Sequence, residues 1–259
     1  MDLAFKKAIS MPTFLFAAAR KKDLGLDCHH SLMNVTATIL QFTKGSLATL
    51  PVELLCESFG YCNVHDLVCL GQSSCTHGAL VGNYIIDCMK LTISCFFPDV
   101  EGFRKMLRSC DAIVSSSSAL HILLPPKSTT WIPVDLDIYV ASSQFHYLKL
   151  LLVGHGYHLL RKGNTNDNPN SFSFIRTVAT FGNGTQQIDV IISNTANIGP
   201  IFQFHSTTVM NFFSADHIFC AYPDLTLRLL ARINPGPLYF GCFQHHTLSA
   251  LWKYAQRGF

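Results

Sequence analysis

The stretch Trp131-Ile132-Pro133-Val134-Asp135-Leu136-Asp137-Ile138-Tyr139-Val140 decides how we expect this chain to fold. Its β-branched and aromatic residues favour a β-strand, and successive side chains on a strand point to opposite faces of the sheet. We therefore expect Asp135 and Asp137 to project together from one face. The apolar residues that alternate with them should point into the core: Val134, Leu136, Ile138 and Val140.

A second stretch, residues 186–192, repeats this alternation with a single acid, Asp189. It follows Gly182-Asn183-Gly184, which is typical of a hairpin turn, so we expect it to pair with the strand before it. Asp189 would then lie on the same sheet as Asp135 and Asp137. Three close carboxylates repel one another unless a cation lies between them, and oxygen ligands of this kind suit Mg²⁺ or Mn²⁺. The alternative is that these acids are only the solvated face of a half-buried sheet.

The composition is that of a folded chain with a large buried fraction. The 259 residues are 49% hydrophobic and 14% charged, enough for one large domain or two modest ones with real cores. The net charge is +3 and the Lys and Arg residues are scattered, so nucleic-acid binding is not indicated. No run of about 18 uncharged apolar residues occurs, and we expect no membrane partner.

The ten cysteines include no Cys-x-x-Cys pair, and most lie within apolar runs. This pattern indicates neither a zinc site nor a disulfide framework, and it favours a reducing compartment, the cytoplasm or the nucleus. Three short groups look like metal ligands but lack a second, spaced group: Cys28-His29-His30, the pair His155 and His158, and His245-His246. Residues 8–19 loosely resemble a signal peptide, but Asp2 and the cysteine pattern argue against export.

Apolar periodicity divides the chain into a helical part and a part with strands. Residues 1–45 have no clear motif, and we expect an N-terminal extension of uncertain order. Three short helices are expected between residues 49 and 89, and the alternation over residues 91–96 predicts a strand. Further along we expect helices at residues 98–109, 119–124 and 142–153, strands at residues 112–114 and 157–161, a hairpin over residues 172–193, and two or three helices after Gly199.

Four serines, Ser115 to Ser118, connect an expected buried strand to an expected helix. Such a turn presents unpaired backbone N–H groups and hydroxyls, the local geometry that holds a phosphate group. A helix N-cap alone would explain one or two of these serines equally well.

Residues 49–82 contain Leu50-Pro51-Val52-Glu53-Leu54-Leu55, then Phe59, then Asp66-Leu67-Val68-Cys69-Leu70-Gly71-Gln72-Ser73-Ser74-Cys75. In this order and spacing they resemble an F-box. The usual F-box pattern is Leu-Pro-x-Glu-Leu-Leu, a bulky apolar residue, and Asp-Leu-x-x-Leu-x-x-Val-Ser. Cys62 stands where the family usually has leucine, and no basic residue follows the last serine.

This resemblance implies a small helical module that docks on the Skp-type linker of a cullin-RING ubiquitin ligase. The residues that it assigns to the docking surface are Leu50, Pro51, Leu54, Leu55, Phe59, Leu67 and Leu70. The alternative is a plain helical hairpin whose leucines all belong to the core.

Residues 100–193 resemble the catalytic palm of the nucleotidyltransferase superfamily typified by DNA polymerase beta. The resemblance lies in the order strand, serine turn, helix, Asp-x-Asp strand, helix, hairpin and Asp strand. It implies that Asp135 and Asp137 bind metal ions, and that Asp189 completes one metal site and deprotonates an attacking hydroxyl.

The same resemblance implies that the serine turn, Ser115, Ser116 and Ser117, holds a nucleoside triphosphate. The family's Gly-Ser pair falls on Ser116-Ser117. A serine in place of the glycine adds a Cβ where the phosphate must approach, which argues against activity.

Together the resemblances imply an α+β protein, similar to a group of fungal proteins that combine the same two parts. An F-box-like helical module over residues 46–90 would precede a nucleotidyltransferase-like domain over residues 91–259, a mixed β-sheet flanked by helices. The first functional hypothesis is an intracellular adaptor that presents an unidentified target to the ligase. The second is a Mg²⁺- or Mn²⁺-dependent nucleotidyltransferase acting on a small molecule, nucleic acid or protein hydroxyl. The third is a catalytically inactive remnant.

Overall fold

The computed structural model describes residues 13–16, 50–164, 174–234 and 245–259. Its elements in chain order are β1 (Thr13–Phe16), α2 (Val52–Phe59), α3 (Val64–Gly71), α4 (Cys75–Ser94), α5 (Val100–Ser109), β2 (Ile113–Ser115), α6 (Ser116–Leu123), β3 (Leu136–Ala141), α7 (Phe145–Gly154), β4 (His158–Asn164), β5 (Ile175–Gly182), β6 (Gln187–Ser193), the 3-10 helices η2 (Gly199–Gln203) and η3 (Thr207–Val209), β7 (Asn211–Phe213), β8 (His217–Cys220), α8 (Pro223–Thr226) and α10 (His245–Gln256).

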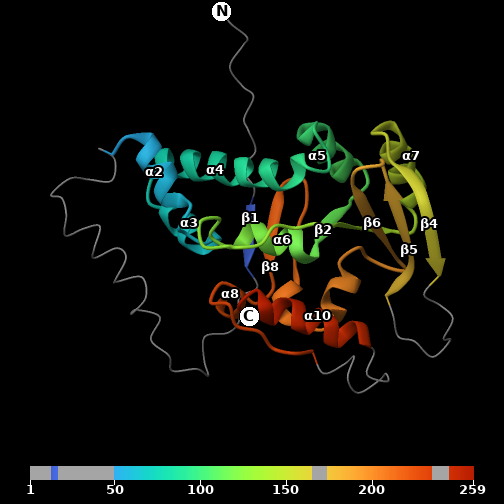
Figure 1. Cartoon of the computed structure of the whole chain (residues 1–259). Coiled ribbons are helices and arrows are strands. Elements are labelled where there is room, and N and C mark those ends of the chain that lie inside the picture. Colours follow the sequence, from blue (N-terminus) through green and yellow to red (C-terminus); the bar gives the residue numbers. More distant parts are fainter. Residues whose placement is uncertain (1–12, 17–49, 165–173, 235–244) are drawn as a thin grey trace, which may run out of the picture.

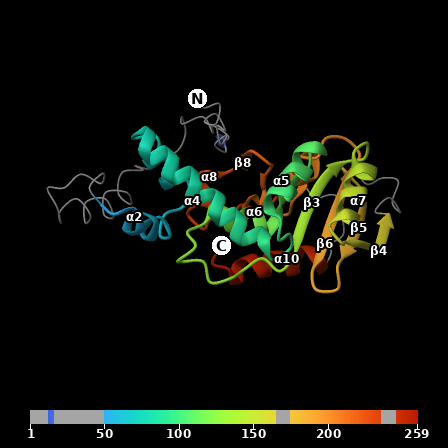
Figure 2. The ribbon, with the colours of Figure 1, turned by 90° about the horizontal axis from the view of Figure 1, so that it is seen from above.

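The described strands form one mixed sheet in the order β1-β8-β7-β2-β3-β6-β5-β4. Strand β3 runs parallel to β6 and β1 runs parallel to β8, whereas the other neighbours are antiparallel. In Figure 1, α4 and α5 lie on one side of the strands and α10 lies on the opposite side. Figure 2 shows α7 beside the end of the sheet that β4, β5 and β6 form. The fold is therefore a mixed sheet with helices packed around it, as expected.

The alternation predicted for the strand that carries the acids is confirmed over β3. Leu136, Ile138 and Val140 are fully buried in the main core, and Tyr139 belongs to a second apolar cluster on the other face. The prediction was wrong for Val134, whose side chain is 71% exposed. Strand β3 begins only at Leu136, so residues 131–135 approach the sheet without regular structure and Val134 has no sheet face to follow.

The helices α2 and α3 form where their start signals predict. Pro51 precedes the first turn of α2 and Glu53 lies within it, where a carboxylate favours the helix N-terminus. Asn63 caps α3 by accepting hydrogen bonds from the backbone N–H groups of His65 and Asp66, and Asp66 completes a capping box.

The inner faces of α2 and α3 belong to the same core as the sheet. The buried Leu55, Phe59 and Leu67 form one continuous apolar cluster with Ile138 of β3 and with residues of α4. The loop that contains Lys127 is connected to the end of α2 by a hydrogen bond. The backbone N–H of Lys127 donates to the carbonyl of Gly60, 2.9 Å away. The helical part and the sheet are therefore packed as one unit.

Helix α4 continues to Ser94, so the strand predicted over residues 91–96 is wrong. The buried residues Val81, Ile85, Met89 and Ile93 recur at every fourth position, which places them in one stripe along a helix. Within the six residues 91–96, the alternation of Leu91 and Ile93 has the two-residue period of a strand. The helical spacing of the buried residues continues through the same segment and determines its structure. The expected boundary after Lys90 falls inside this helix. None of the described helices is long and apolar enough to span a lipid bilayer.

The helices expected after Gly199 are only partly present. Phe212 and Phe213 lie in β7, which pairs with β2 and with β8. Strands of three and four residues are too short to show a clear period, and packing on the sheet decides their structure. Strand β1 also shows that residues 13–16, expected to be an extension of uncertain order, pair with β8.

Most of the other elements agree with the prediction. Helices α5 and α7, strands β2 and β4 and the hairpin of β5 and β6 lie where they were expected. Helix α6 begins at Ser116, three residues earlier than predicted.

The continuous helix α4 predicts opposite results for two neighbouring truncations. Ile93→Ala removes a side chain with no exposed surface, and should lower the free energy of unfolding by about 2–5 kcal/mol. Leu91→Ala, at a side chain that is 74% exposed, should change it by no more than about 0.5 kcal/mol. Urea unfolding measures both. Equal losses would contradict the helix, because a strand places residues 91 and 93 on the same face.

Candidate functional site

The parallel pairing of β3 with β6 places two of the predicted acids side by side. Asp137 and Asp189 are direct partners in this register, so their side chains leave the same face of the sheet. Asp135 lies two residues before Asp137, immediately before β3 begins. The three carboxylates are close enough for both Asp135 and Asp189 to raise the pKa of Asp137.

The electrostatics of this carboxylate cluster, Asp135, Asp137 and Asp189, are dominated by Asp137. Burial raises the pKa of Asp137 to about 7, and the neighbouring Asp135 and then Asp189 act in the same direction. Hydrogen bonding from Ser116 and the positive charge of Lys253 oppose this shift. At neutral pH the carboxyl group of Asp137 is therefore divided between its protonated and ionised forms.

The predicted acid just before this strand, Asp135, is held by two helices. The hydroxyl of Ser117 donates to its Oδ1 at 3.0 Å, and the hydroxyl of Ser118 donates to its backbone carbonyl at 3.1 Å. From α10, Lys253 Nζ lies 3.9 Å from its Oδ2. Asp135 is thus contacted both by the nearby start of α6 and by the C-terminal helix, which is distant in sequence.

Asp189 is positioned by the neighbouring strand β5. Thr180 lies directly opposite Asp189 in the antiparallel register, and its hydroxyl donates to Asp189 Oδ1 at 2.6 Å. Arg161 Nε donates in turn to the Thr180 hydroxyl oxygen at 3.2 Å. The sequence could have predicted Thr180, because pairing the two strands outward from the hairpin turn places it opposite Asp189. No local signal marks Lys253, because helix packing alone brings it to the site.

The serine turn is engaged within the protein rather than open. The hydroxyl of Ser115 donates to the backbone carbonyl of Asn211 on β7, and the hydroxyls of Ser117 and Ser118 bind Asp135. Of the three residues predicted to hold a triphosphate, only Ser116 keeps a partly accessible side chain. Its φ of 61° lies in the left-handed region that favours glycine. The side chain of Ser116 therefore occupies the position where a bound phosphate would have to approach the backbone.

The three acids have the oxygen chemistry that Mg²⁺ and Mn²⁺ prefer. Among the residues that the structure describes, however, no group of three or more His, Cys, Asp or Glu side chains is arranged to hold a metal ion. A metal ion at this position would also have to displace a proton from Asp137 at neutral pH.

The histidine-containing groups of the sequence gain no support as metal sites. Cys28-His29-His30 and the side chains of His245 and His246 lie outside the described residues. The ring of His155 packs edge-on against Phe97, with 5.5 Å between the ring centroids.

The residues predicted to dock on a ligase linker separate into two groups. Leu55, Phe59 and Leu67 are buried in the main core, and Leu70 packs partly against it, so these side chains are not available to a partner. Leu50, Pro51 and Leu54 are exposed. Two apolar residues that the prediction did not include, Val52 and Tyr61, are exposed as well. We call the exposed set the α2 surface: Leu50, Pro51, Val52, Leu54 and Tyr61.

Comparison with protein-family models found no family that matches this chain, and comparisons with curated proteins and with solved structures found no match. The function is therefore argued from the residues and their geometry.

The raised pKa of Asp137 predicts that the folded protein becomes less stable between pH 4 and pH 7. The ordinary pKa of this carboxyl is 3.8, so as the pH rises the unfolded chain releases the proton before the folded one does. Stability that is fully present below pH 4 is lost as the pH approaches 7. Asp137→Asn removes this ionisation. Relative to the wild type, the free energy of unfolding of this variant should therefore rise by up to about 4 kcal/mol between pH 4 and pH 7.

Urea unfolding of the wild type and of Asp137→Asn at several pH values measures this gain. Asp224→Asn, which removes an exposed carboxylate of α8, is the matched control. Parallel pH curves for the wild type and Asp137→Asn would show that the folded protein does not perturb Asp137.

Proposed function

We propose that this protein is an adaptor whose α2 surface docks on the Skp-type linker of a cullin-RING ubiquitin ligase, and whose sheet presents a target. The observation that carries the proposal is the group of exposed apolar side chains at the start of α2. Leu55 and Phe59 enter the core, whereas Leu50, Val52 and Leu54 are exposed. Exposed apolar side chains gathered at one end of a short helix are typical of an element that binds a partner helix.

The attachment of α2 to the rest of the protein supports this role. The loop before Trp131 contacts the turn between α2 and α3 through the backbone hydrogen bond from Lys127 to Gly60. Lys127 Nζ also lies 2.8 Å from Glu57 Oε1, although an exposed ion pair of this kind adds little to stability. Gly60 is closely covered, because a Cβ there would lie 2.7 Å from Lys127 Cγ. An adaptor needs such a fixed connection, since the target must be held at a defined position relative to the ligase.

Replacing an apolar residue of the α2 surface by an acid should abolish linker binding. Leu54 is 57% exposed, so Leu54→Asp should leave the fold intact and place a charge in the contact. Leu91→Asp, at an exposed leucine of α4, is the matched control and should bind as the wild type does. A pull-down with the purified Skp-type linker measures both. Equal capture of Leu54→Asp and the wild type, or no capture of the wild type, would reject the proposal.

A second function, nucleotidyl transfer, is favoured by one observation: Asp137 and Asp189 are paired in register beside a residue in the left-handed backbone region. Mg²⁺ is commonly held by one or two carboxylates together with the phosphates of a substrate, so a cage of three acids is not required. In this proposal Asp137 and Asp189 would hold the ion and the start of α6 would face the triphosphate. The ion would supply charge neutralisation at the phosphate oxygens.

This second function predicts that Mg²⁺ and a nucleoside triphosphate together raise the heat stability of the protein. At about 100 times its dissociation constant the nucleotide should add about 2.7 kcal/mol. Combining Asp135→Asn and Asp137→Asn should remove the Mg²⁺-dependent part of this response. Ser116→Gly should strengthen it, because glycine accepts the left-handed φ and removes a Cβ from the approach.

Differential scanning calorimetry with and without Mg²⁺ measures these responses. An unchanged response in the double variant would place any nucleotide site elsewhere. No response to any triphosphate would instead favour the catalytically inactive remnant, and it would leave the docking proposal untouched.

A further inference from the structure

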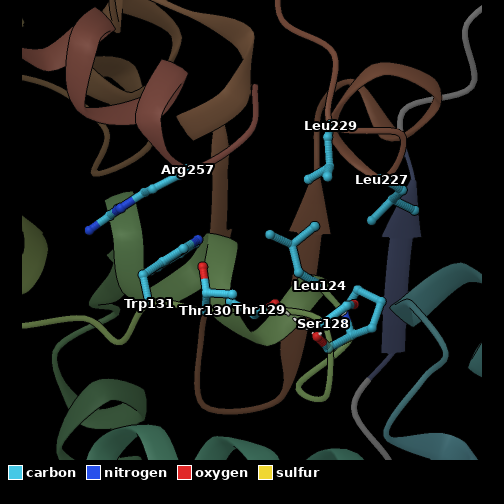
Figure 3. A pocket seen from close by; sticks show the side chains of 9 residues that line it. Leu124, Ser128, Thr129, Thr130, Trp131, Leu227, Leu229 and Arg257 are labelled. Atoms are coloured by element: carbon cyan, nitrogen blue, oxygen red, sulfur yellow. Dashed lines mark hydrogen bonds between the residues drawn. The ribbon is translucent and has the colours of Figure 1, made fainter.

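A cavity of about 150 Å³ lies between the C-terminal end of the chain and the loop that leads into β3. Figure 3 shows its walls: Trp131 and Thr130 of the loop, Leu124 after α6, Leu227 and Leu229 after α8, and Arg257 after α10. These segments are distant in sequence and meet only in the fold. The cavity is separate in its residues from the carboxylate cluster and from the α2 surface.

Arg257 is the one charged side chain among the cavity-lining residues. Its guanidinium carbon lies 3.9 Å from the centre of the Trp131 ring and 5.2 Å from that of Tyr254. Figure 3 shows the guanidinium extended across the indole. Stacking of this kind fixes the orientation of the guanidinium, which also hydrogen-bonds the Tyr254 side chain, and leaves its other in-plane N–H groups to bind a partner.

The charge of Arg257 is not balanced by an acid. Within the part of the chain that the structure describes, no carboxylate lies within 4.0 Å of it, and its buried Nη1 makes no hydrogen bond. Burial and the charge of Arg257 lower the pKa of the nearby His121, which favours the neutral ring, so His121 does not balance the charge of Arg257. A buried guanidinium nitrogen without a partner is costly, so the site favours an anion.

Apart from Arg257, the cavity wall combines apolar side chains with the hydroxyl-bearing residues Ser128, Thr129 and Thr130. Leu124 is buried, and Leu227 and Leu229 line the cavity from the segment after α8. Leu229 has a φ of 56°, a left-handed conformation that is unfavourable for a leucine and is found mainly at constrained or ligand-binding positions. A cavity of this volume has room for a molecule the size of benzene.

We propose that this cavity binds a small carboxylate with a compact apolar body, whose carboxylate is held by Arg257 and whose body packs on Trp131, Leu124, Leu227 and Leu229. A carboxylate matches the planar fork of the guanidinium and can bind it through two parallel hydrogen bonds. The proposal is independent of both functions proposed above, because it uses none of their residues.

Trp131 gives a direct readout of binding. The sequence has two tryptophans, and Trp252 is 67% exposed on α10, so Trp252→Phe leaves Trp131 as the only reporter without removing a core side chain. In this background, titration with benzoate should change the fluorescence of Trp131 saturably, with a dissociation constant below about 10 mM. Benzamide has the same shape without the charge, and should bind about tenfold more weakly or worse.

Variants of Arg257 decide whether it is the ligand-binding group. Arg257→Met keeps the length of the side chain and should weaken benzoate binding about tenfold or more, whereas Arg257→Lys should retain part of the affinity. Arg228→Met, at an exposed arginine beside Leu227, removes the same charge from the surface and should bind as the parent does. Circular dichroism melting of each variant establishes that it is folded, and variants are compared below their melting temperatures.

Three results would overturn the proposal: no saturable response to benzoate, equal affinity for benzoate and benzamide, or unchanged affinity in Arg257→Met. Inorganic phosphate is the further probe. If it bound as tightly as benzoate, the cavity would be a general anion site, and the apolar body in the proposal would be wrong.

Discussion

The parallel pairing of β3 with β6 is the constraint on which the rest of this structure depends. It places the carboxyl groups of Asp137 and Asp189 next to each other on a partly buried face, where two negative charges are unfavourable. Three features of the surrounding structure reduce this repulsion. Asp137 takes up a proton near neutral pH, Thr180 donates a hydrogen bond to Asp189, and Lys253 brings a positive charge to Asp135.

The C-terminal part of the chain contacts both the carboxylate cluster and the cavity. Helix α10 supplies Lys253 to the carboxylate cluster, and the residues just after it supply Arg257 to the cavity beside Trp131. Trp131 and Asp135 lie in the same irregular segment before β3, so the C-terminal residues contact both ends of that segment. The serines of α6 also hold the segment through Asp135. The carboxylate cluster and the cavity are thus joined by one irregular segment of the chain.

The sequence predicted well those features that short-range patterns determine. Alternation placed Leu136, Ile138 and Val140 in the core, and the Gly182-Asn183-Gly184 turn identified the hairpin of β5 and β6. It failed where two periods fit the same residues, as with Leu91 and Ile93 in α4, and where strands are too short to show a period, as with β7. The acids of the site were found because they lie on or next to strands, whereas Lys253 reaches the site, and Arg257 the cavity, through tertiary packing that no local pattern encodes. The four serines do connect a buried strand to a helix, but Ser116 to Ser118 are the first residues of α6 rather than a separate turn. Their hydroxyl partners depend on Asn211 and Asp135, which the fold brings close.

The uninterrupted course of α4 bears on how the chain can be divided. Parts of a chain that fold independently are normally joined by an exposed linker that few contacts cross. Here a cut after Lys90 would divide a helix, separating Met89 from Ile93 and exposing Phe96 and Phe97 of the common core. Each piece would lose the packing that its neighbour supplies. The helices before the sheet and the sheet itself therefore behave as one folding unit, and a fragment ending at Lys90 is a poor substitute for the whole chain.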